Sequence, residues 1–302
     1  MTLSVISSMF RSFFTLINNQ NNRSKRILFL LKLLWWKVNQ KFVRLPVVIP
    51  LFKNIKCICY PQSSFGGLIV YTTYPEYSET RLVQKLLRES SVFIDVGANI
   101  GYYSLLAASI IKKGKIFAFE VDKRALNNFY ENINLNKLED KIDVIEKLVS
   151  DKDGYERFIV SSESEVNRIV GESENNKDFL KFPCIKLDSF AKEKNISFID
   201  FLKIDVEGAE YKVLKGAEEL LKEKRIKYLL FEVNKNLKDY GKSKKDVFEM
   251  LSNFGYRIYK FVDGGDNFIE KLENFDSLSD ETRNYFASLK PLNIKRLNKA
   301  LR

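Results

Sequence analysis

The chain of 302 residues has no histidine and only three cysteines. The absence of histidine removes the commonest general base and the commonest metal ligand. Three cysteines make neither a disulfide framework nor a zinc set, which fits a reduced, cytoplasmic setting. We expect one of them, Cys184, to be a small buried residue. Acid–base chemistry must therefore come from carboxylates, lysines, tyrosines or a metal-bound group.

Acidic residues are absent from the first 75 positions, which hold ten lysines and arginines. The rest of the chain has 40 basic and 39 acidic residues, so nearly all of the net charge of +11 lies in the N-terminal segment. A nucleic-acid-binding protein usually spreads its basic residues over a folded face. This distribution indicates instead a basic arm on a nearly neutral domain, with no nucleic-acid partner.

A long apolar run is also lacking. The most apolar stretch of the arm is RILFLLKLLWWK at residues 26–37, well short of the roughly 20 residues that span a bilayer. No cleavage site of small residues follows it, as a signal peptide would require. Trp35 and Trp36 beside a lysine would suit a membrane interface, and a helix packed on its own domain or on a partner is the alternative. We expect a cytoplasmic protein, with peripheral membrane contact through residues 23–44 as an open hypothesis.

From about residue 78, apolar runs of strand length alternate with amphipathic segments of helix length. The strand-length runs, such as VFIDV and KIFAFEV, are apolar on both faces, which predicts a parallel sheet with helices on both sides. Ligands of such sheets bind beyond the carboxyl ends of the strands. Acidic residues stand at four of these ends: Asp95, Glu120, Asp205 and Glu232.

The first strand runs into a loop with the sequence DVGANIG. Gly97 and Gly101 let the backbone approach a ligand, and the following helix N-terminus favours a carboxylate. Asp95 suits an ammonium group, and Glu120 is placed to accept hydrogen bonds from two ribose hydroxyls. Asn99 stands where a dinucleotide loop has its second glycine and would obstruct a pyrophosphate. A ligand with an amino acid and a ribose, S-adenosylmethionine, fits better than NAD.

Two neighbouring features admit more than one interpretation. Tyr102 and Tyr103 open the helix after the loop and are expected in the core, with cofactor contact as the alternative. The polar stretch from Ser161 to Asp178 is either a solvated loop or a lid over the acceptor.

The chain resembles the FkbM-type S-adenosylmethionine-dependent methyltransferases over roughly residues 74–260, through FIDVGANIGYYS, FAFEVD, LVSDKDG and IDFLKIDVEGAEYKVLKGA. The resemblance implies a class I methyltransferase fold, an α/β Rossmann-like sheet of seven mostly parallel strands with the last antiparallel. It implies O-methylation of hydroxyls on sugars, glycolipids or polyketide-like products. It assigns cofactor binding to Asp95, Gly97, Asn99, Gly101 and Glu120, and Glu76 falls near the acidic position before the family's first helix.

The reaction that this resemblance implies needs a group to take the hydroxyl proton. In KIDVEGAE, Asp205 and Glu207 stand on alternate residues of an expected strand end, so both can face one side. Either could take the proton directly, or the two could hold Mg²⁺, and we favour the direct base. Glu232 could serve as base or substrate clamp. Glu210 is expected to complement a helix N-terminus, and Lys203 is either structural or orients Asp205.

We therefore predict three segments: a basic N-terminal helical arm with a lead-in (1–73), a methyltransferase domain (74–262) and a C-terminal helical extension (263–302). The expected acceptor is a small molecule or glycan. Two alternatives are a non-catalytic scaffold of the same fold in glycan assembly and, less favoured, an NAD(P)-dependent oxidoreductase. A nucleic-acid methyltransferase is disfavoured because the domain is neutral and lacks an N/D-P-P-Y-type motif. The sequence specifies neither the oligomeric state nor the acceptor.

Overall fold

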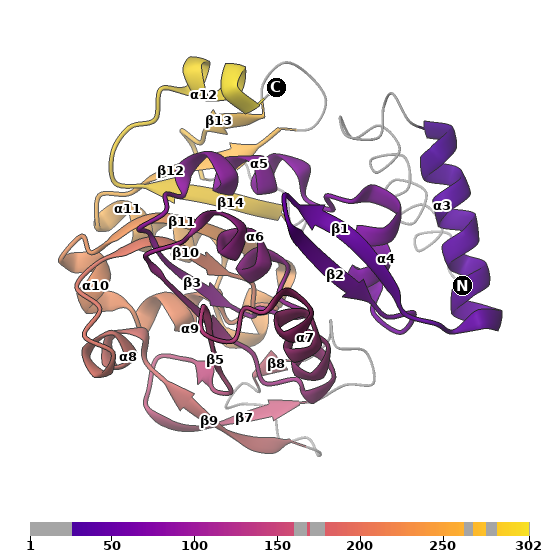
Figure 1. The fold of residues 1–302 in the computed structure, drawn as a ribbon. Coiled ribbons are helices and arrows are strands. Elements are labelled where there is room, and N and C mark those ends of the chain that lie inside the picture. Colours follow the sequence, from indigo (N-terminus) through magenta and orange to yellow (C-terminus); the bar gives the residue numbers. More distant parts are fainter. Residues whose placement is uncertain (1–25, 160–167, 170–178, 263–267, 276–282, 302) are drawn as a thin grey trace.

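A mixed sheet of eight strands forms the centre of the protein in a computed structural model (Figure 1). The structure describes residues 26–159, 168–169, 179–262, 268–275 and 283–301. The strand order is β13-β12-β14-β11-β10-β3-β4-β5. The strands are β3 (Val92–Val96), β4 (Lys115–Phe119), β5 (Ile142–Ile145), β10 (Ile199–Ile204), β11 (Ile226–Val233), β12 (Arg257–Phe261), β13 (Ile269–Lys271) and β14 (Arg283–Ser288).

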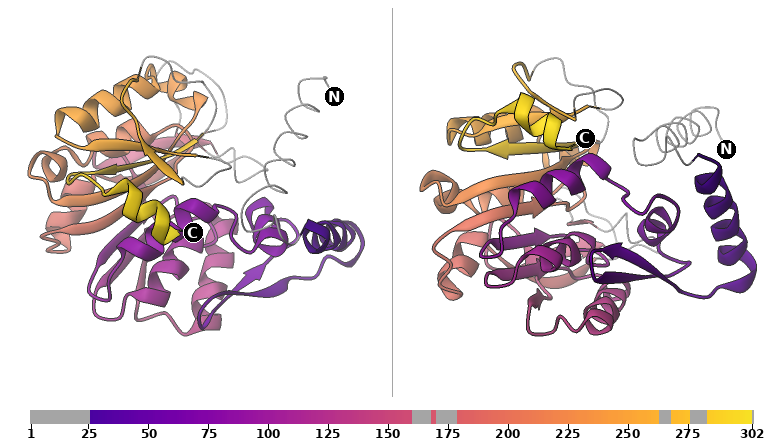
Figure 2. Two further views of the ribbon diagram at one scale, coloured as in Figure 1. Left: turned by 90° about the horizontal axis from the view of Figure 1, so that it is seen from above. Right: turned by 45° about the horizontal axis from the view of Figure 1, so that its top comes forward.

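Helices cover both faces of this sheet, as the apolar strands predict (Figures 1 and 2). Alternate residues of each strand serve the two faces: Phe93 and Phe201 pack on one side, whereas Ile94 and Leu202 pack on the other. The first face carries α5 (Tyr77–Leu86), α6 (Tyr102–Ile110), α7 (Lys123–Asn136) and α12 (Ile294–Leu301). The second carries α8 (Leu187–Glu193), α9 (Glu210–Lys215), α10 (Glu218–Lys222) and α11 (Lys244–Asn253).

Two strands near the end of the chain run antiparallel to the rest of the sheet. β14 lies between β11 and β12 and is antiparallel to both, and β13 is antiparallel to β12 at the edge. Without β13, the strand order is that of a class I methyltransferase fold, which the resemblance implies. The prediction of a helical extension at 263–302 is wrong, because this segment supplies β13, β14 and α12. The sheet would be incomplete within the predicted boundary at residue 262.

The N-terminal segment is only partly an arm. α3 (Arg26–Val38) and the π-helical turn η1 (Asn39–Val43) lead into a hairpin of β1 (Val47–Phe52) and β2 (Ile55–Cys59), then α4 (Ser64–Thr72). The hairpin is attached to α7, since Asn132 Oδ1 accepts the backbone N–H of Ile58 at 2.6 Å. The described chain contains no helix that is both long and apolar enough to cross a membrane.

A second, smaller sheet joins the domain between β5 and α8. It contains β6 (Leu148–Val149), β9 (Leu180–Ile185), β7 (Gly154–Ile159) and β8 (Arg168–Ile169), in that spatial order. The run IDVIEKLVS is divided between β5 and β6, which belong to different sheets. Most of the expected loop or lid lies outside the described residues. Cys184 is buried, as predicted.

Candidate active site

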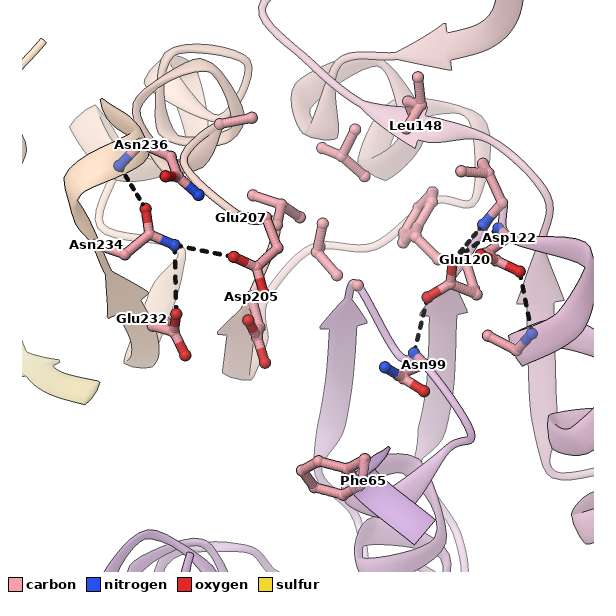
Figure 3. A pocket seen from close by; sticks show the side chains of 18 of the residues that line it. Phe65, Asn99, Glu120, Asp122, Leu148, Asp205, Glu207, Glu232, Asn234 and Asn236 are labelled. Atoms are coloured by element: carbon pink, nitrogen blue, oxygen red, sulfur yellow. Dashed lines mark hydrogen bonds between the residues drawn. The ribbon is translucent and has the colours of Figure 1, made fainter. Parts of the chain in front are cut away.

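One pocket of about 780 Å³ opens at the carboxyl ends of β3, β4, β10 and β11 (Figure 3). Parallel strands bring their carboxyl ends to one edge, which is where the sequence places the site. Most lining residues come from α4, the turn before α5, the carboxyl ends of these four strands with the loops that follow them, and the small sheet. They include Phe65, Leu68, Tyr71, Glu76, Gly97, Asn99, Glu120, Val121, Asp122, Leu148, Phe158, Ile169, Asp205, Glu207, Glu232, Asn234 and Asn236.

The loop after β3 forms one wall of the pocket. Gly97 and Asn99 both line it, and both have positive φ, 77° and 51°. A Cβ on Gly97 would lie 1.8 Å from the carbonyl oxygen of Asp205, so any side chain would push the two loops apart. Gly101 does not line the pocket; a Cβ there would lie 2.1 Å from the ring of Phe129. Glycine is therefore needed at Gly101 for packing between α6 and α7, a role that differs from the predicted contact with the cofactor.

Glu120 presents a carboxylate whose direction is fixed by the backbone. Its Oε1 accepts the N–H groups of Val121 at 2.7 Å and Asp122 at 2.8 Å, and its Oε2 accepts that of Asn99 at 2.8 Å (Figure 3). Burial raises the pKa of this carboxyl above its usual value, against the opposing effect of the three N–H groups. Oε1 thus has both lone pairs occupied, whereas Oε2 retains one for a further donor. The position suits the ribose hydroxyls that the sequence predicts for it.

An apolar recess adjoins Glu120. It is formed by Val121, Phe158, Ile169 and Ala209, which pack together and line the pocket. Two of these residues come from the small sheet, which the sequence did not connect with the site. The recess beside a carboxylate suits a nucleoside, with the base against apolar side chains and the sugar hydroxyls on Glu120. S-adenosylmethionine therefore fits the residues present here.

Asp95 lies behind the pocket wall rather than in it. Its side chain is fully buried, accepts the hydroxyl of Ser104 at 2.7 Å and does not line the pocket. Burial raises its pKa, while the ammonium of Lys203 acts in the opposite direction. The predicted contact with a cofactor ammonium is therefore not what this geometry provides. In the extended strand, the Asp95 side chain points toward α6 and the neighbouring strand instead of the loop.

Lys203 is a buried cation between two carboxylates. It stands beside Asp95 in the pairing of β10 with β3, and its Nζ lies 2.9 Å from Asp205 Oδ2 and 4.0 Å from Asp95 Oδ1. The same Nζ lies 5.0 Å from the ring centroid of Tyr103. Burial alone would lower the pKa of Lys203, but the surrounding carboxylates hold it above its usual value. Of the two predicted roles, the structure supports orientation of Asp205.

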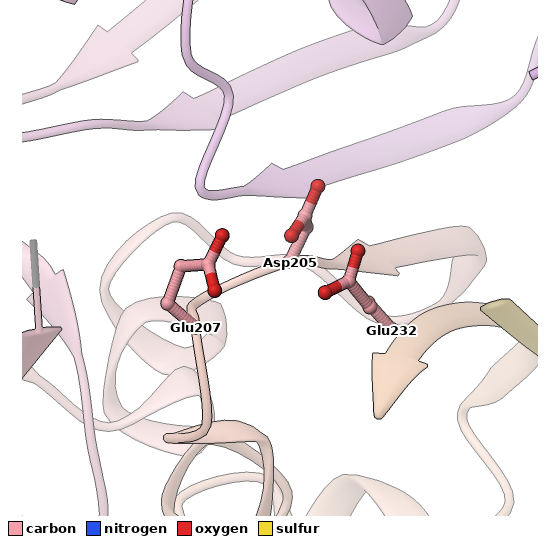
Figure 4. A group of neighbouring side chains, drawn as sticks. All are labelled: Asp205, Glu207 and Glu232. Carbon is pink, nitrogen blue, oxygen red and sulfur yellow. The ribbon is translucent and has the colours of Figure 1, made fainter. Parts of the chain in front are cut away.

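Asp205, Glu207 and Glu232 converge at the other end of the pocket (Figure 4). One carboxylate oxygen from each lies within 4.8 Å of the other two. The predicted convergence of Asp205 and Glu207 occurs, but not by alternation along a strand. β10 ends at Ile204, and Glu207 has a left-handed φ of 52° that turns its side chain back toward Asp205.

Asn234 connects this acidic cluster and was not predicted. Its Nδ2 donates to Glu207 Oε2 at 3.1 Å and lies 3.4 Å from Glu232 Oε1 (Figure 3). Burial, and then the carboxylates of Asp205 and Glu207, raise the pKa of Glu232 to about 9. Glu232 is therefore protonated at neutral pH. The place of Asn234 two residues after a strand-end glutamate was the one signal that could have identified it.

Glu76 lies in the pocket wall on the side of the acidic cluster. It precedes α5, accepts a hydrogen bond from the Tyr103 hydroxyl and accepts the Nδ2 of Asn284 on β14 at 2.9 Å. Burial raises its pKa, and Lys203 opposes that rise. Tyr102 and Tyr103 themselves are buried and do not line the pocket, which confirms the expectation of core positions. Asn284 was missed because its segment was assigned to a tail.

The buried carboxyl of Glu210 should make the stability of the fold depend on pH. It is fully buried at the start of α9, where its Oε1 accepts the Gly208 N–H at 2.9 Å and burial raises its pKa to about 8. The folded protein thus binds this proton more tightly than the unfolded chain, so stability is lost as pH rises from the ordinary glutamate pKa to about 8. Glu210→Gln avoids this loss and should be more stable than wild type at pH 8.5, by on the order of 4 kcal/mol.

Urea unfolding at pH 8.5 and pH 5 measures the effect, and the two proteins should converge at pH 5. Glu219→Gln is the matched control, because this side chain is exposed and pairs with Lys192 on the surface. A Glu210→Gln protein that is less stable at both pH values would show that the ionised carboxylate is the stabilising form.

The methyltransferase FkbM domain family matches residues 95–258, which is more than half of the chain. A 2-O-methyltransferase, NoeI, of Sinorhizobium fredii is 26% identical over 163 residues, covering 49% of this chain and 66% of that protein. A ribosomal protein L11 methyltransferase of Carboxydothermus hydrogenoformans is 39% identical over 62 residues, 20% of each chain. The chain thus spans just under two thirds of the first relative and a fifth of the second.

Among solved structures, the methyltransferase FkbM of Methylobacillus flagellatus is similar with a TM-score of 0.43 and 14% identity. The match covers 74% of this chain and 53% of that one. The fold assignment rests on the strand order described above, and the family assignment rests on the domain match. The resemblance found in the sequence is thereby confirmed: the chain belongs to the FkbM family of methyltransferases.

Proposed function

We propose that the protein is an S-adenosylmethionine-dependent O-methyltransferase that acts on a hydroxyl of a saccharide, a glycolipid or a related metabolite. One observation carries this proposal. A single pocket joins a nucleoside-shaped half, around Glu120, to an acidic half formed by Asp205, Glu207 and Glu232. The membership of the FkbM family supplies the reaction class.

The chemistry of the acidic half follows from proton balance. S-adenosylmethionine supplies an electrophilic methyl group, and a hydroxyl acceptor must lose its proton as its oxygen attacks. The chain has no histidine, so a carboxylate is the natural acceptor of that proton. Glu232 is protonated at neutral pH, which leaves Asp205 and Glu207 as the candidate bases. Protonated Glu232 can donate a hydrogen bond to the acceptor, consistent with the substrate clamp considered from the sequence.

The lining of the acidic half favours an acceptor rich in hydroxyls. Carboxylate and amide groups from Glu76, Glu207, Glu232, Asn234 and Asn236 face the same space. Such groups pair well with sugar hydroxyls, whereas clustered carboxylates repel a phosphate next to the reacting atom. This argues against a nucleic-acid acceptor. The name of the Sinorhizobium relative, a 2-O-methyltransferase, agrees with transfer to oxygen.

A divalent cation is the alternative to direct proton transfer. The three carboxylates of the cluster are near enough to each other to hold Mg²⁺ through oxygen ligands. We favour the direct base because Lys203 already supplies a cation 2.9 Å from Asp205. Retention of activity in EDTA supports the direct base, and loss that Mg²⁺ restores supports the metal.

Calorimetric titration tests the cofactor assignment. The wild-type protein should bind S-adenosylhomocysteine at micromolar concentration and should bind neither NAD nor NADP. Glu120→Ala should weaken binding at least about 100-fold, because the ribose loses a charged hydrogen-bond acceptor. Asp143→Ala is a matched control, since this acid is exposed on the next strand and does not line the pocket.

Asp95→Ala separates direct contact from indirect support. It should weaken binding less than Glu120→Ala does, because Asp95 does not reach the pocket. Equal loss of affinity in both variants would support the predicted contact between Asp95 and the cofactor ammonium. A folded wild-type protein that binds none of the three ligands would overturn the proposed cofactor and favour the scaffold alternative.

A further inference from the structure

α3 exposes an apolar stripe on the side opposite its packed face. Phe29 and Trp36 are buried against the domain, whereas Ile27, Leu31 and Leu34 are 76%, 59% and 65% exposed. With Val38, these residues follow the spacing i, i+4, i+7, i+11, which places them on one line along a helix. The helix stands at the outer side of the molecule, beyond α4 (Figures 1 and 2). An amphipathic surface helix normally presents its polar face to solvent, whereas α3 has apolar side chains on its exposed face as well as on its packed face.

The apolar surface continues past the end of α3. Phe42 and Val43 of η1 are exposed, and so are Leu45 and Val48 next to it. Large exposed apolar patches of this kind mark contacts with another molecule or with a membrane.

Basic residues accompany the stripe. Lys37 and Lys41 are exposed and Lys32 is half-buried along the same segment, and no acidic residue occurs anywhere in positions 1–75. Trp35 is half exposed beside them. Apolar side chains on the exposed face, tryptophan at the edge and lysines around them match the chemistry of an anionic bilayer surface.

α3 is also connected to the pocket. The ring of Phe29 packs edge-on against Tyr71 of α4, with centroids 5.6 Å apart. Tyr71 lines the pocket together with Phe65 and Leu68 of the same helix. On the same face of α3, two turns further along, Trp36 packs so closely on α4 that a Cβ on Gly67 would lie 2.6 Å from its Nε1. α4 thus lies between the pocket and α3, the helix that carries the exposed stripe.

We propose that α3 and η1 dock on the surface of an anionic membrane, which brings the pocket to a lipid-linked acceptor. The α3 helix has 13 residues, about 20 Å in length, which is too short to span a bilayer but suffices to lie in its interface. Charge complementarity favours an anionic membrane over a second copy of the chain as the partner, because two copies of this surface would bring lysine against lysine. The docking does not depend on methyl transfer; only the delivery of the acceptor rests on the proposed function.

Flotation with vesicles tests the docking. The full-length protein should float with vesicles of phosphatidylcholine and phosphatidylglycerol and should bind pure phosphatidylcholine vesicles about tenfold more weakly or worse. The double variant Ile27→Ser, Leu34→Ser should lose at least about tenfold in binding. Leu135→Ser, Phe198→Ser is the matched control, because both side chains are comparably apolar, are about 40% exposed and lie elsewhere. The control should bind as wild type does.

The two tryptophans of the chain give a second readout. Trp35 is 50% exposed and Trp36 is 1% exposed, so only Trp35 can change its surroundings on docking. Tryptophan fluorescence emission should shift to the blue when anionic vesicles are added, and Trp35→Phe should remove the shift.

Equal flotation of the α3 double variant and the matched control would overturn the proposal. So would the absence of vesicle binding together with concentration-dependent dimerisation, which would identify a second copy as the occupant. S-adenosylhomocysteine binding, measured on the same protein, reports separately on the proposed function.

Discussion

The double variant Asp205→Asn, Glu207→Gln should transfer methyl groups about 10²- to 10⁴-fold more slowly than wild type, the range expected for loss of a general base. Neither residue is near Glu120, which lies at the nucleoside end of the pocket (Figure 3), so affinity for S-adenosylhomocysteine should change by only a few-fold. The measurement is the rate of transfer from labelled S-adenosylmethionine to a hydroxyl acceptor in a glycan or lipid extract. Groups that act as one unit are not additive, so the single variant that equals the double identifies the base.

Glu232→Gln is the internal control for this experiment. Glu232 has its pKa raised to about 9, mainly by burial, so it is neutral at pH 7 and glutamine resembles that form. The variant should keep activity within a few-fold of wild type at pH 7. Above pH 9 wild-type Glu232 ionises beside two carboxylates, so the wild-type rate should fall, whereas the variant should show no such fall. A wild-type rate that rises through pH 9, with an inactive variant, would instead make Glu232 the base.

Most of the fold and the ends of the pocket were predictable, because they depend on local pattern. Apolar strands in alternation with amphipathic helices require a covered parallel sheet, and such a sheet places its strand-end residues at one edge. Glu120, Asp205 and Glu232 line the pocket at that edge, as predicted. The motif after the first strand supplied Gly97 and Asn99 at the same edge. Predicting these positions requires only the order of the strands along the chain, not the way in which they pack.

The missed features depend on contacts between distant segments. β14 joins the sheet through pairing with β11, some 55 residues earlier, and its sequence RNYFAS has a run of only three apolar residues, too short to identify a buried strand. Asn284 reaches Glu76 across 208 residues. Asp95 was expected at a strand end like the other acids, yet it lies within β3, and its side chain faces Ser104 on α6 and Lys203 on the neighbouring strand instead of the pocket. In the turn after β10, Glu207 has a left-handed φ, and Gly208 packs too closely on Asn236 to carry a side chain; sequence spacing reveals neither.

Lys203→Met should destabilise the fold by about 3–5 kcal/mol at pH 8, the cost of leaving buried charges without a partner. Lys203 is 6% exposed and is the cation that faces Asp95 and Asp205 in the described part of the chain. Methionine fills similar volume but supplies no charge. Urea unfolding of Lys215→Met is the control, since that lysine pairs with Glu218 on the surface and should cost less than about 1 kcal/mol.

The pH dependence of Lys203→Met distinguishes lost charge from lost packing. Burial raises the pKa values of Asp95 and Glu76, and Lys203 opposes both rises. Without the lysine, these carboxyls bind protons still more tightly in the folded than in the unfolded state, so stability increases as pH falls. The deficit should therefore shrink markedly between pH 8 and pH 5, and the double variant Lys203→Met, Asp205→Asn should recover part of it at pH 8. A deficit that stays constant across this range would mean that Lys203 stabilises the domain by packing, and that the carboxylates beside it do not need its charge.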